Sequence, residues 1–354
     1  MSHNILITGG SGYLGGSLLH RLPTAGLPPY NKLFALVRTD AQAEKVKELY
    51  DAHPLQVDLH DEAAVQKSIE DNDISVVFFL IDAANPTMQV PMIKGLAEVK
   101  KRKGGDVHFL HTTGAKLFSS HAGAPTDHPL LDTDPKLYEI QKSQKATFTP
   151  AQKASTFYTA IDTNNTVVDV AEPLGVHSYI FAPCIVYGKG EGFGNTISIQ
   201  TVAIVKAAKA ARRVYRTDEG KPTWPVCHIN DNTSLYTTIL KAILSGANPG
   251  YGKHGYYLAS PGSVAWDDLY DAMAAALHQH GVIDDARVEL ADRAALEKMA
   301  QGTGNPPEMV HFEVGGKCTF TAKHGYQLGW EPEYKPEHIL ETAGDEVSLI
   351  LANL

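Results

Sequence analysis

The fold is decided by the stretch Ile5-Leu6-Ile7-Thr8-Gly9-Gly10-Ser11-Gly12-Tyr13-Leu14-Gly15. Its first three residues are apolar and predict a short buried β-strand. Residues 17–22 follow the glycines and place Leu18, Leu19 and Leu22 on one side of an amphipathic helix. The order of elements at the start of the chain is therefore strand, glycine-rich turn and helix.

The glycines of this turn predict a binding site for a diphosphate group. Gly9, Gly12 and Gly15 let the backbone approach a ligand more closely than any side chain would permit. The amides at the start of the helix add hydrogen-bond donors and a partial positive charge. The stretch also reads as G-x-G-x-x-G through Gly10, Gly12 and Gly15. Because the pattern follows a strand and opens a helix, we expect a bound dinucleotide; the alternative is a glycine-rich turn without a ligand.

Length and composition exclude several classes of protein. The chain has 354 residues, of which 43% are hydrophobic, and a formal net charge of -9. We therefore expect a globular protein whose partner is a small-molecule substrate, with no nucleic acid and no membrane. The sequence shows no membrane-spanning run and no secretory signal. Cys184, Cys227 and Cys318 lie far apart without metal-site spacing, so we expect a cytoplasmic location and no metal.

Strand and helix patterns alternate with a period near thirty residues, which predicts an α/β fold with a doubly wound, Rossmann-type parallel sheet. We expect the dinucleotide-binding domain to span residues 1–187, with residues 225–260 returning to it. A smaller mixed α/β lobe that binds the substrate is expected at residues 188–354, with helices at 266–277 and 338–354. The sequence leaves open whether the protein is a monomer or a homodimer.

Three further details follow from this alternation of strands and helices. Residues 56–59 predict a third strand that carries Asp58 and Leu59. The small-residue turn around Ala83, which follows the apolar run 75–81, suits close approach of a cofactor. Asp231 is expected to cap the N-terminus of a helix over residues 233–244.

Arg38 ends the second predicted strand, at the position that selects the cofactor in this type of fold. An acidic residue there would bind the hydroxyl groups of the adenosine ribose, whereas an arginine can pair with a 2′-phosphate through two charge-assisted hydrogen bonds. Arg38 therefore favours NADP, with NAD as the alternative. A solvated arginine without a ligand is the other interpretation of this residue.

Several motifs together resemble the extended and atypical short-chain dehydrogenase/reductase superfamily. They are the glycine turn, Arg38, Asp58, Ala182-Pro183-Cys184-Ile185-Val186-Tyr187-Gly188, His228-Ile229-Asn230-Asp231 and Leu328-Gly329-Trp330-Glu331-Pro332. The chain is most similar to fungal members described as NAD-dependent epimerase/dehydratase-like, and the resemblance covers nearly the whole sequence. It implies that the pyrophosphate is held by Gly9, Gly12, Tyr13 and Leu14, the adenine by Asp58 and Leu59, and the nicotinamide end by Pro183 and Val186.

The catalytic residues of this superfamily are a Ser or Thr after the fifth strand and a Tyr-x-x-x-Lys pair. A lysine four residues after a tyrosine shares its helix face and lowers the pKa of the phenol. Tyr138 and Lys142 have this spacing, and Thr113 lies 25 positions before Tyr138 (138 minus 113). We expect Tyr138 to act as general acid, Lys142 to tune it and Thr113 to hold the carbonyl oxygen.

The sequence leaves alternatives to this catalytic set. The position that aligns with the usual Ser is Gly114, and a second predicted helix places Tyr158 where the catalytic helix normally lies, with Asp162 in place of the lysine. An acidic partner raises the pKa of a phenol, so this pair could not work in the usual way. Three histidines after the fifth strand are further candidates for proton transfer: His111, His121 and His128.

Three functions remain open at this stage. The first is an NADP-dependent oxidoreductase of the carbonyl reductase or alcohol dehydrogenase type. The second is an epimerase, dehydratase or lyase that retains its nucleotide, and the third is a module that senses the redox state of NADP(H) without catalysis. The loop at residues 188–195 is expected to border the substrate, with Phe193, Trp224 and Tyr187 as an aromatic wall.

Overall fold

A parallel β-sheet forms the centre of the computed structural model, which describes residues 2–144, 146, 148 and 156–354, without the side chains of residues 156–158. The strands are β1 (Asn4–Ile7), β2 (Lys32–Leu36), β3 (His53–Leu55), β4 (Ile74–Phe79), β5 (His108–Thr112), β7 (His177–Pro183) and β11 (Tyr256–Ala259). Their order is β11-β7-β5-β4-β1-β2-β3, and all neighbours are parallel. The expected Rossmann-type sheet is confirmed.

The strand order reverses beside β1, and this reversal determines where a ligand can bind. The chain builds outward from β1 through β2 to β3 and then crosses back to place β4 on the other side of β1. The crossover leaves a crevice at the carboxyl ends of β1 and β4, where open parallel sheets bind their ligands. β4 is buried along its whole length because helices cover both faces of the sheet.

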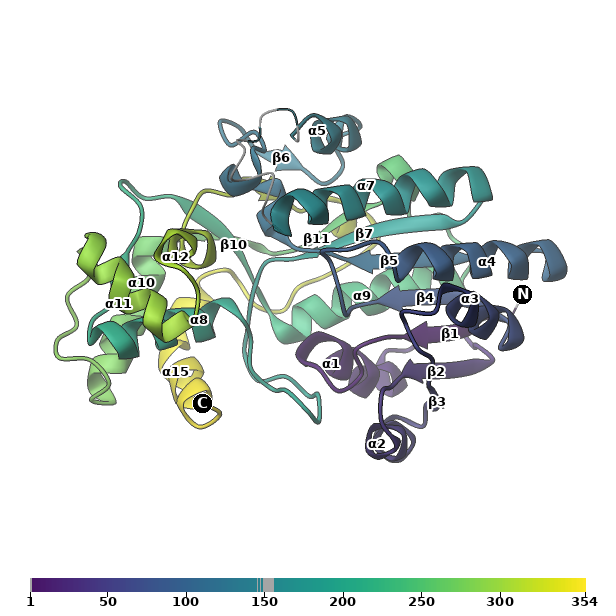
Figure 1. Ribbon diagram of the computed structural model, residues 1–354, viewed down its shortest axis with the longest axis horizontal. Helices are drawn as coiled ribbons and strands as arrows, with labels where there is room; N and C mark the ends of the chain where they lie inside the picture. The colour runs from purple at the N-terminus through teal and green to yellow at the C-terminus, as the bar shows by residue number, and fades with distance from the viewer. Residues whose placement is uncertain (1, 145, 147, 149–155) are drawn as a thin grey trace.

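Helices pack on both faces of this sheet (Figure 1). One face carries α3 (Glu62–Asp71), α4 (Gln89–Lys103) and α7 (Thr156–Leu174), which contact one another in that order. The other face carries α1 (Tyr13–Arg21), α2 (Asp40–Tyr50) and α9 (Ile229–Leu244), with α1 in the middle. A shorter helix, α5 (Leu137–Gln144), packs against α7.

The C-terminal part of the chain forms a second lobe beyond the carboxyl edge of the sheet, at the left of Figure 1. Its helices are α8 (Gln200–Ala211), α10 (Trp266–Gln279), α11 (Arg293–Thr303), α12 (Pro307–Val314), α14 (His338–Glu341) and α15 (Ala343–Leu351). The short helix α13 (His324–Gln327) packs instead against β11 and α9. A small sheet has the order β12-β10-β8, made by β8 (Ile185–Tyr187), β10 (Thr223–His228) and β12 (Gly262–Ala265). Two further pairs of short parallel strands are present. One pairs β9 (Tyr215–Arg216) with β13 (Glu289–Leu290), and the other pairs β6 (Leu130–Leu131) with β14 (Phe320–Thr321).

Short 3-10 turns join several of these elements. They are η1 (Leu22–Thr24), η2 (Ala115–Phe118), η3 (Ser120–Ala122) and η5 (Gly252–His254). The turn η2 follows β5 directly and therefore starts at the carboxyl edge of the sheet, where it is part of the site described below.

Four details differ from the sequence-based expectations. The third strand ends at Leu55, so residues 56–59 form a loop beyond it. Helix α9 begins after His228, whose ring accepts a hydrogen bond from the Asn230 amide, and Asp231 lies inside the first turn. The Asp231 carboxylate instead accepts hydrogen bonds from the amides of Glu333 and Tyr334. The helix expected over residues 338–354 is two helices, α14 and α15.

Residues 225–260, which were expected to return to the dinucleotide-binding domain, contribute to both sheets. β11 pairs with β7 and completes the large sheet, whereas β10 lies in the small sheet.

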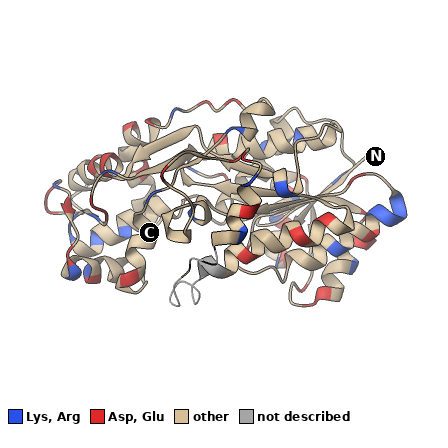
Figure 2. Cartoon of the chain, turned by 90° about the horizontal axis from the view of Figure 1, so that it is seen from above, with Lys and Arg blue, Asp and Glu red and all other residues tan. Residues whose placement is uncertain are grey.

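No helix of the described part of the chain is long and apolar enough to cross a membrane. In the view of Figure 2, basic and acidic residues are interspersed over the helices.

Candidate functional site

A cleft of about 1330 Å³ lies at the carboxyl ends of the sheet strands, between the sheet and the second lobe. It starts at the glycine turn after β1, passes the ends of β2 and β4, and reaches the segment after β5 and the junction of β7 with β8. The lobe contributes residues 193–200 in part, together with one residue of β10. The side of the cleft nearest the second lobe is lined by Thr113, Gly114, Ala115, Lys116, Pro183, Cys184, Val186, Phe193, Asn195, Ile197, Ser198, Ile199, Gln200 and Trp224.

The glycine turn has the geometry that a diphosphate requires. Gly9 has a φ of +72°, and its carbonyl accepts a hydrogen bond of 2.9 Å from the Gly12 amide. A Cβ atom on Gly15 would lie 2.4 Å from the Gly9 oxygen, so a side chain at Gly15 cannot be accommodated. Helix α1 begins at Tyr13 without a side-chain cap. Its first amides are therefore left for a ligand in the cleft.

The loop at residues 188–195 packs directly on this turn. The Gly194 amide donates a hydrogen bond of 2.8 Å to the Ser11 carbonyl, and the Tyr13 hydroxyl donates one of 2.7 Å to the Gly188 carbonyl. A Cβ on Gly192 would lie 2.1 Å from the Gly12 oxygen, which shows how closely the two backbones approach. The loop thereby holds Phe193, which lines the cleft, against the glycine turn.

The end of the cleft beside β2 carries the positive charge of the Arg38 guanidinium. Arg38 is exposed and lines the cleft, and its amide donates a hydrogen bond of 2.9 Å to Gln42 Oε1. Within the described residues, the Arg38 guanidinium has neither a hydrogen bond nor an ion pair with another side chain. The Asp58 carboxylate accepts a bond of 2.9 Å from the His60 amide and so shapes the loop beside it. The guanidinium is therefore available to an anionic ligand.

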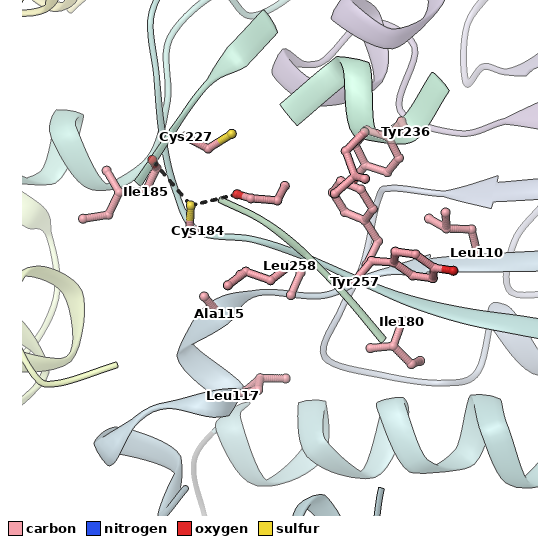
Figure 3. Packing of buried hydrophobic residues seen from close by; sticks show 14 of the residues in the cluster. Leu110, Ala115, Leu117, Ile180, Cys184, Ile185, Cys227, Tyr236, Tyr257 and Leu258 are labelled. Atoms are coloured by element: carbon pink, nitrogen blue, oxygen red, sulfur yellow. Dashed lines mark hydrogen bonds between the residues drawn. The ribbon is translucent and has the colours of Figure 1, made fainter. Parts of the chain in front are cut away.

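The opposite end of the cleft carries Thr113. Its amide donates a hydrogen bond of 2.8 Å to the Phe181 carbonyl, which fixes the segment after β5 against β7. Its Oγ1 is buried and has no hydrogen-bond partner among the described residues. The nearby Cys184 thiol donates to the Ala259 carbonyl at 3.1 Å, and burial raises its pKa well above the usual range. Figure 3 shows Cys184 among the packed apolar side chains, close to Ile185. Cys184 is thus part of the cleft floor and not a reactive thiolate.

The structure brings together most residues that the sequence predicts for the nucleotide. The following predicted residues line one continuous cleft together with Thr113: Gly9, Gly12, Tyr13, Leu14, Arg38, Asp58, Leu59, Pro183 and Val186. Ala83 does not line it, whereas its neighbours Ile81 and Asp82 do. The residues present therefore fit a dinucleotide: an uncapped helix start, a turn with no room for side chains, and a free guanidinium at one end.

Tyr138 and Lys142 lie outside this cleft. Both are on α5, and the Tyr138 hydroxyl donates a hydrogen bond to the carboxylate of Asp169 on α7. Lys142 forms an ion pair of 3.1 Å with the same carboxylate. Burial and the bond to Asp169 raise the pKa of Tyr138, which is the opposite of what a proton donor near neutral pH needs. The structure does not bring this pair together with Thr113, and we do not retain it in the proposed site.

The position of Tyr138 gives a direct prediction. Tyr138→Phe removes a hydroxyl that, among the described residues, bonds only within the α5–α7 contact, so we expect kcat/KM to stay within about twofold of wild type and stability to fall by about 1 kcal/mol. Steady-state kinetics and urea unfolding measure the two effects. Loss of turnover by about 100-fold with unchanged stability would return Tyr138 to the catalytic set.

The other sequence-based candidates for proton transfer also lie elsewhere. His111 is fully buried in β5, and the His121 ring contacts the Gly315 carbonyl at 2.8 Å. His128 is exposed beside Asp127. Tyr158 lies in α7, and its side chain is outside the described residues. In the expected aromatic wall, Phe193 and Trp224 line the cleft, whereas the Tyr187 hydroxyl is directed to His338 Nδ1 at 3.0 Å.

Sequence reasoning missed Lys116. It lies on η2, three residues after Thr113, and lines the cleft. Burial lowers its pKa from 10.5 to about 8. A lysine so close to the predicted Thr113 was a signal in the sequence, although no motif marks it. No group of three or more residues able to hold a metal ion occurs among those that were described.

Comparisons with known proteins identify the family to which the N-terminal part of the chain is similar. Residues 5–111, which contain the glycine turn, Arg38 and β1 to β5 almost completely, match the profile of the NAD dependent epimerase/dehydratase family. Residues 5–111 belong to that family. The resemblance stated from the sequence is thereby confirmed, and with it the expected class, an NAD(P)-dependent enzyme of the short-chain dehydrogenase/reductase type.

More distant relatives extend the similarity over the whole chain. The chain is 22% identical to the oxidase ucsJ of an Acremonium species, over 95% of this chain and 94% of that protein. Its fold matches the PbgP3 protein of Burkholderia pseudomallei with a TM-score of 0.65 at 14% identity, covering 99% of both chains. It also matches DesIV, a dTDP-glucose 4,6-dehydratase of Streptomyces venezuelae solved with NAD bound, with a TM-score of 0.64 at 12% identity over 99% and 97% of the chains. At these identities the epimerase/dehydratase-like domain shares the fold of these proteins.

Proposed function

We propose that this epimerase/dehydratase-like chain is an NADP-dependent oxidoreductase that reduces a carbonyl group, or oxidises an alcohol, in a small-molecule substrate. The observation that supports it is a single cleft that runs from the Arg38 guanidinium, past the glycine turn, to Thr113. Its volume of about 1330 Å³ exceeds the roughly 300–1,000 Å³ of a pocket for one drug-sized ligand. The cleft therefore has space for a nucleotide with a substrate beside it.

The two ends of the cleft would bind different groups of the nucleotide and the substrate. The amides at the start of α1 would hold the pyrophosphate, and Arg38 would pair with the 2′-phosphate of the adenosine ribose. Pro183 and Val186 would border the nicotinamide, which supplies or accepts a hydride when the nucleotide is bound. Thr113 Oγ1 would donate a hydrogen bond to the carbonyl oxygen of the substrate, since the protein itself offers that hydroxyl no acceptor among its described residues.

The preference for NADP can be tested at Arg38. Arg38→Ala removes the group that we assign to the 2′-phosphate, so we expect the affinity for NADPH to fall by about 10- to 100-fold, the equivalent of one charge-assisted contact. The affinity for NADH should change by less than about threefold, because NADH lacks that phosphate. Isothermal titration calorimetry with both nucleotides measures the ratio.

An arginine far from the cleft provides the control. Arg293 on α11 is 90% exposed in its side chain and pairs only within its own helix, with Glu297. Arg293→Ala should leave both affinities unchanged. Equal losses of NADPH and NADH affinity in Arg38→Ala, or no loss of either, would contradict a 2′-phosphate contact. Tighter binding of NADH than of NADPH by the wild-type protein would make NAD the natural cofactor.

A second function is favoured by the family of residues 5–111. An epimerase or dehydratase uses its nicotinamide transiently, and DesIV is a dehydratase with a similar fold. Such an enzyme retains its nucleotide and shows no net redox turnover. Nicotinamide that stays with the purified protein through dialysis, without NADPH consumption on a panel of aldehydes and ketones, would select this function over the oxidoreductase.

A further inference from the structure

Lys116 is placed where a substrate would meet the nicotinamide end of the cleft. It belongs to η2, which begins directly after the Thr113–Gly114 segment at the end of β5. It lines the cleft together with Thr113, Cys184 and Trp224, which come from three separate segments of the chain. The residue is half-buried and contributes to the lining of the cleft.

Lys116 has no hydrogen bond or ion pair among the described residues, unlike the partly buried Lys100 and Lys253 and the exposed Lys142. Lys100 donates a hydrogen bond of 2.8 Å to the Gly175 carbonyl and pairs with Asp106 at 3.6 Å. Lys142 and Lys253 each pair with a carboxylate at 3.1 Å. Lys116 makes no hydrogen bond or ion pair with any residue described here, although it lies within electrostatic range of Glu313 on α12 and of His121 on η3.

Two further donors on the same wall also lack acceptors. Thr113 Oγ1 and Trp224 Nε1 are buried and without a hydrogen-bond partner among the described atoms. A buried donor with no acceptor costs about 1–3 kcal/mol. Two buried donors without an acceptor, on residues that line the cleft together with Lys116, therefore point to a ligand atom that accepts hydrogen bonds, such as a carbonyl or alkoxide oxygen.

We propose that Lys116 Nζ contacts the oxygen of the reacting carbonyl group and supplies its proton, with Thr113 positioning that oxygen. This inference rests on the proposed oxidoreductase function. As the carbonyl carbon gains a hydride, the π electrons of the C=O bond move to the oxygen, and the oxygen takes a proton from Nζ. The lysine is left as a neutral amine, and it regains its proton from water in the open cleft. In the direction of alcohol oxidation, the neutral amine accepts the hydroxyl proton.

The electrostatic setting of Lys116 suits this exchange. Burial lowers the pKa of its ammonium to about 8, so the group is protonated at neutral pH but gives up its proton more readily than an exposed lysine. One titratable group on the elements around it influences this balance, and a second one responds to the charge of Lys116. The Glu313 carboxylate raises the pKa of Lys116, and the positive charge of Lys116 helps to lower the pKa of His121 to about 4.

Lys116→Met and Lys116→Arg test the assignment, with Lys136→Met as a matched control on an exposed lysine outside the cleft. We expect Lys116→Met to lower kcat for NADPH-dependent carbonyl reduction by about 100- to 10,000-fold, the usual contribution of a general acid. Lys116→Arg should not restore kcat, because a guanidinium keeps its charge but does not release its proton near neutral pH. Lys136→Met should match wild type. An Arg variant with wild-type kcat would overturn proton transfer, and so would a Met variant within about threefold of wild type.

A titration independent of turnover separates this inference from the proposed function. Reductive ¹³C-methylation of the nucleotide-free protein lets each lysine be followed by NMR, and the signal lost in Lys116→Met identifies Lys116. We expect that signal to titrate near pH 8 and to shift when NADPH is added, while calorimetry shows equal NADPH affinity in wild type and Lys116→Met. A midpoint near the ordinary 10.5 would overturn the inference. Normal titration results with no turnover on any substrate would instead contradict the oxidoreductase function.

Discussion

Gly15→Ala is expected to abolish nucleotide binding, with a loss of affinity of at least about 100-fold for NADP(H). The new Cβ would lie 2.4 Å from the Gly9 carbonyl oxygen and 2.7 Å from that of Thr8, both of which are backbone atoms that no rotamer change can move. The turn must open to relieve this contact, and opening it moves the amides that we assign to the pyrophosphate. Overpacking at such a site also costs about 1–3 kcal/mol of stability.

A graded series makes this prediction specific to the turn. Gly12→Ala should give a smaller loss of affinity, because its Cβ would lie 3.2 Å from the Gly9 oxygen. Gly344→Ala is the control: it lies in α15, and its Cβ would meet nothing within 4 Å. That variant should bind NADP(H) normally and be as stable as wild type or slightly more stable. Calorimetry gives the affinities, and circular dichroism shows that each variant is folded. Normal binding by a folded Gly15→Ala would refute the site.

The second large effect expected is a loss of stability in mild acid. Burial lowers the pKa of His108 and of His111 from 6.5 to about 3. A group whose pKa is depressed by folding binds its proton mainly in the unfolded chain, so its contribution to stability is complete above about pH 6.5 and declines as the pH falls toward the folded-state pKa. Each such histidine should cost roughly 2 kcal/mol between pH 7 and pH 5.

Other groups modify this pH dependence in known directions. His121 and His228, with pKa values lowered to about 4, add to the loss. Burial raises the pKa of Asp132, Asp231 and Glu346, and these carboxyl groups oppose it as the pH approaches their own titration range. The net effect between pH 7 and pH 5 should still be destabilising, because the histidines titrate first in the unfolded chain. Urea unfolding at several pH values measures the net slope.

His111→Leu isolates one of these contributions. Neither ring nitrogen of His111 has a hydrogen-bond partner among the described residues, so leucine removes two buried polar atoms without breaking a bond. We expect this variant to be at least as stable as wild type at pH 7 and to lose roughly 2 kcal/mol less between pH 7 and pH 5. His128→Gln, on the exposed His128, is the control and should follow the wild-type slope. An unchanged slope in His111→Leu would show that His111 takes up its proton as readily in the folded protein as in the unfolded chain.

The nucleotide half of the cleft was predictable because its signals are local in sequence. A strand, a glycine turn and a helix follow one another within residues 5–22, and the backbone contacts that require Gly15 involve residues only a few positions away. Arg38 is equally local, since it follows directly from the end of β2. The third strand was placed too late along the chain, because the apolar pattern at residues 56–59 belongs to the loop that lines the cleft and not to the sheet.

The substrate half depends on contacts that spacing cannot show. Tyr138 and Lys142 have the spacing of a catalytic pair, yet the same spacing places two side chains beside one carboxylate on a neighbouring helix. Asp169, which holds both of them, lies 31 residues after Tyr138. Lys116 stands out only in three dimensions, because it makes no hydrogen bond or ion pair with the described residues and lines a cleft together with Val186 of β8 and Trp224 of β10.

The strand order has a consequence for synthesis on the ribosome. β7 lies between β5 and β11, and β11 ends 76 residues after β7 does (259 minus 183). A nascent chain that has released β7 but not yet β11 therefore presents the open edge of β7 to other polypeptides, and unpaired edges promote aggregation. A truncation before Tyr256, which removes β11, should therefore yield insoluble protein.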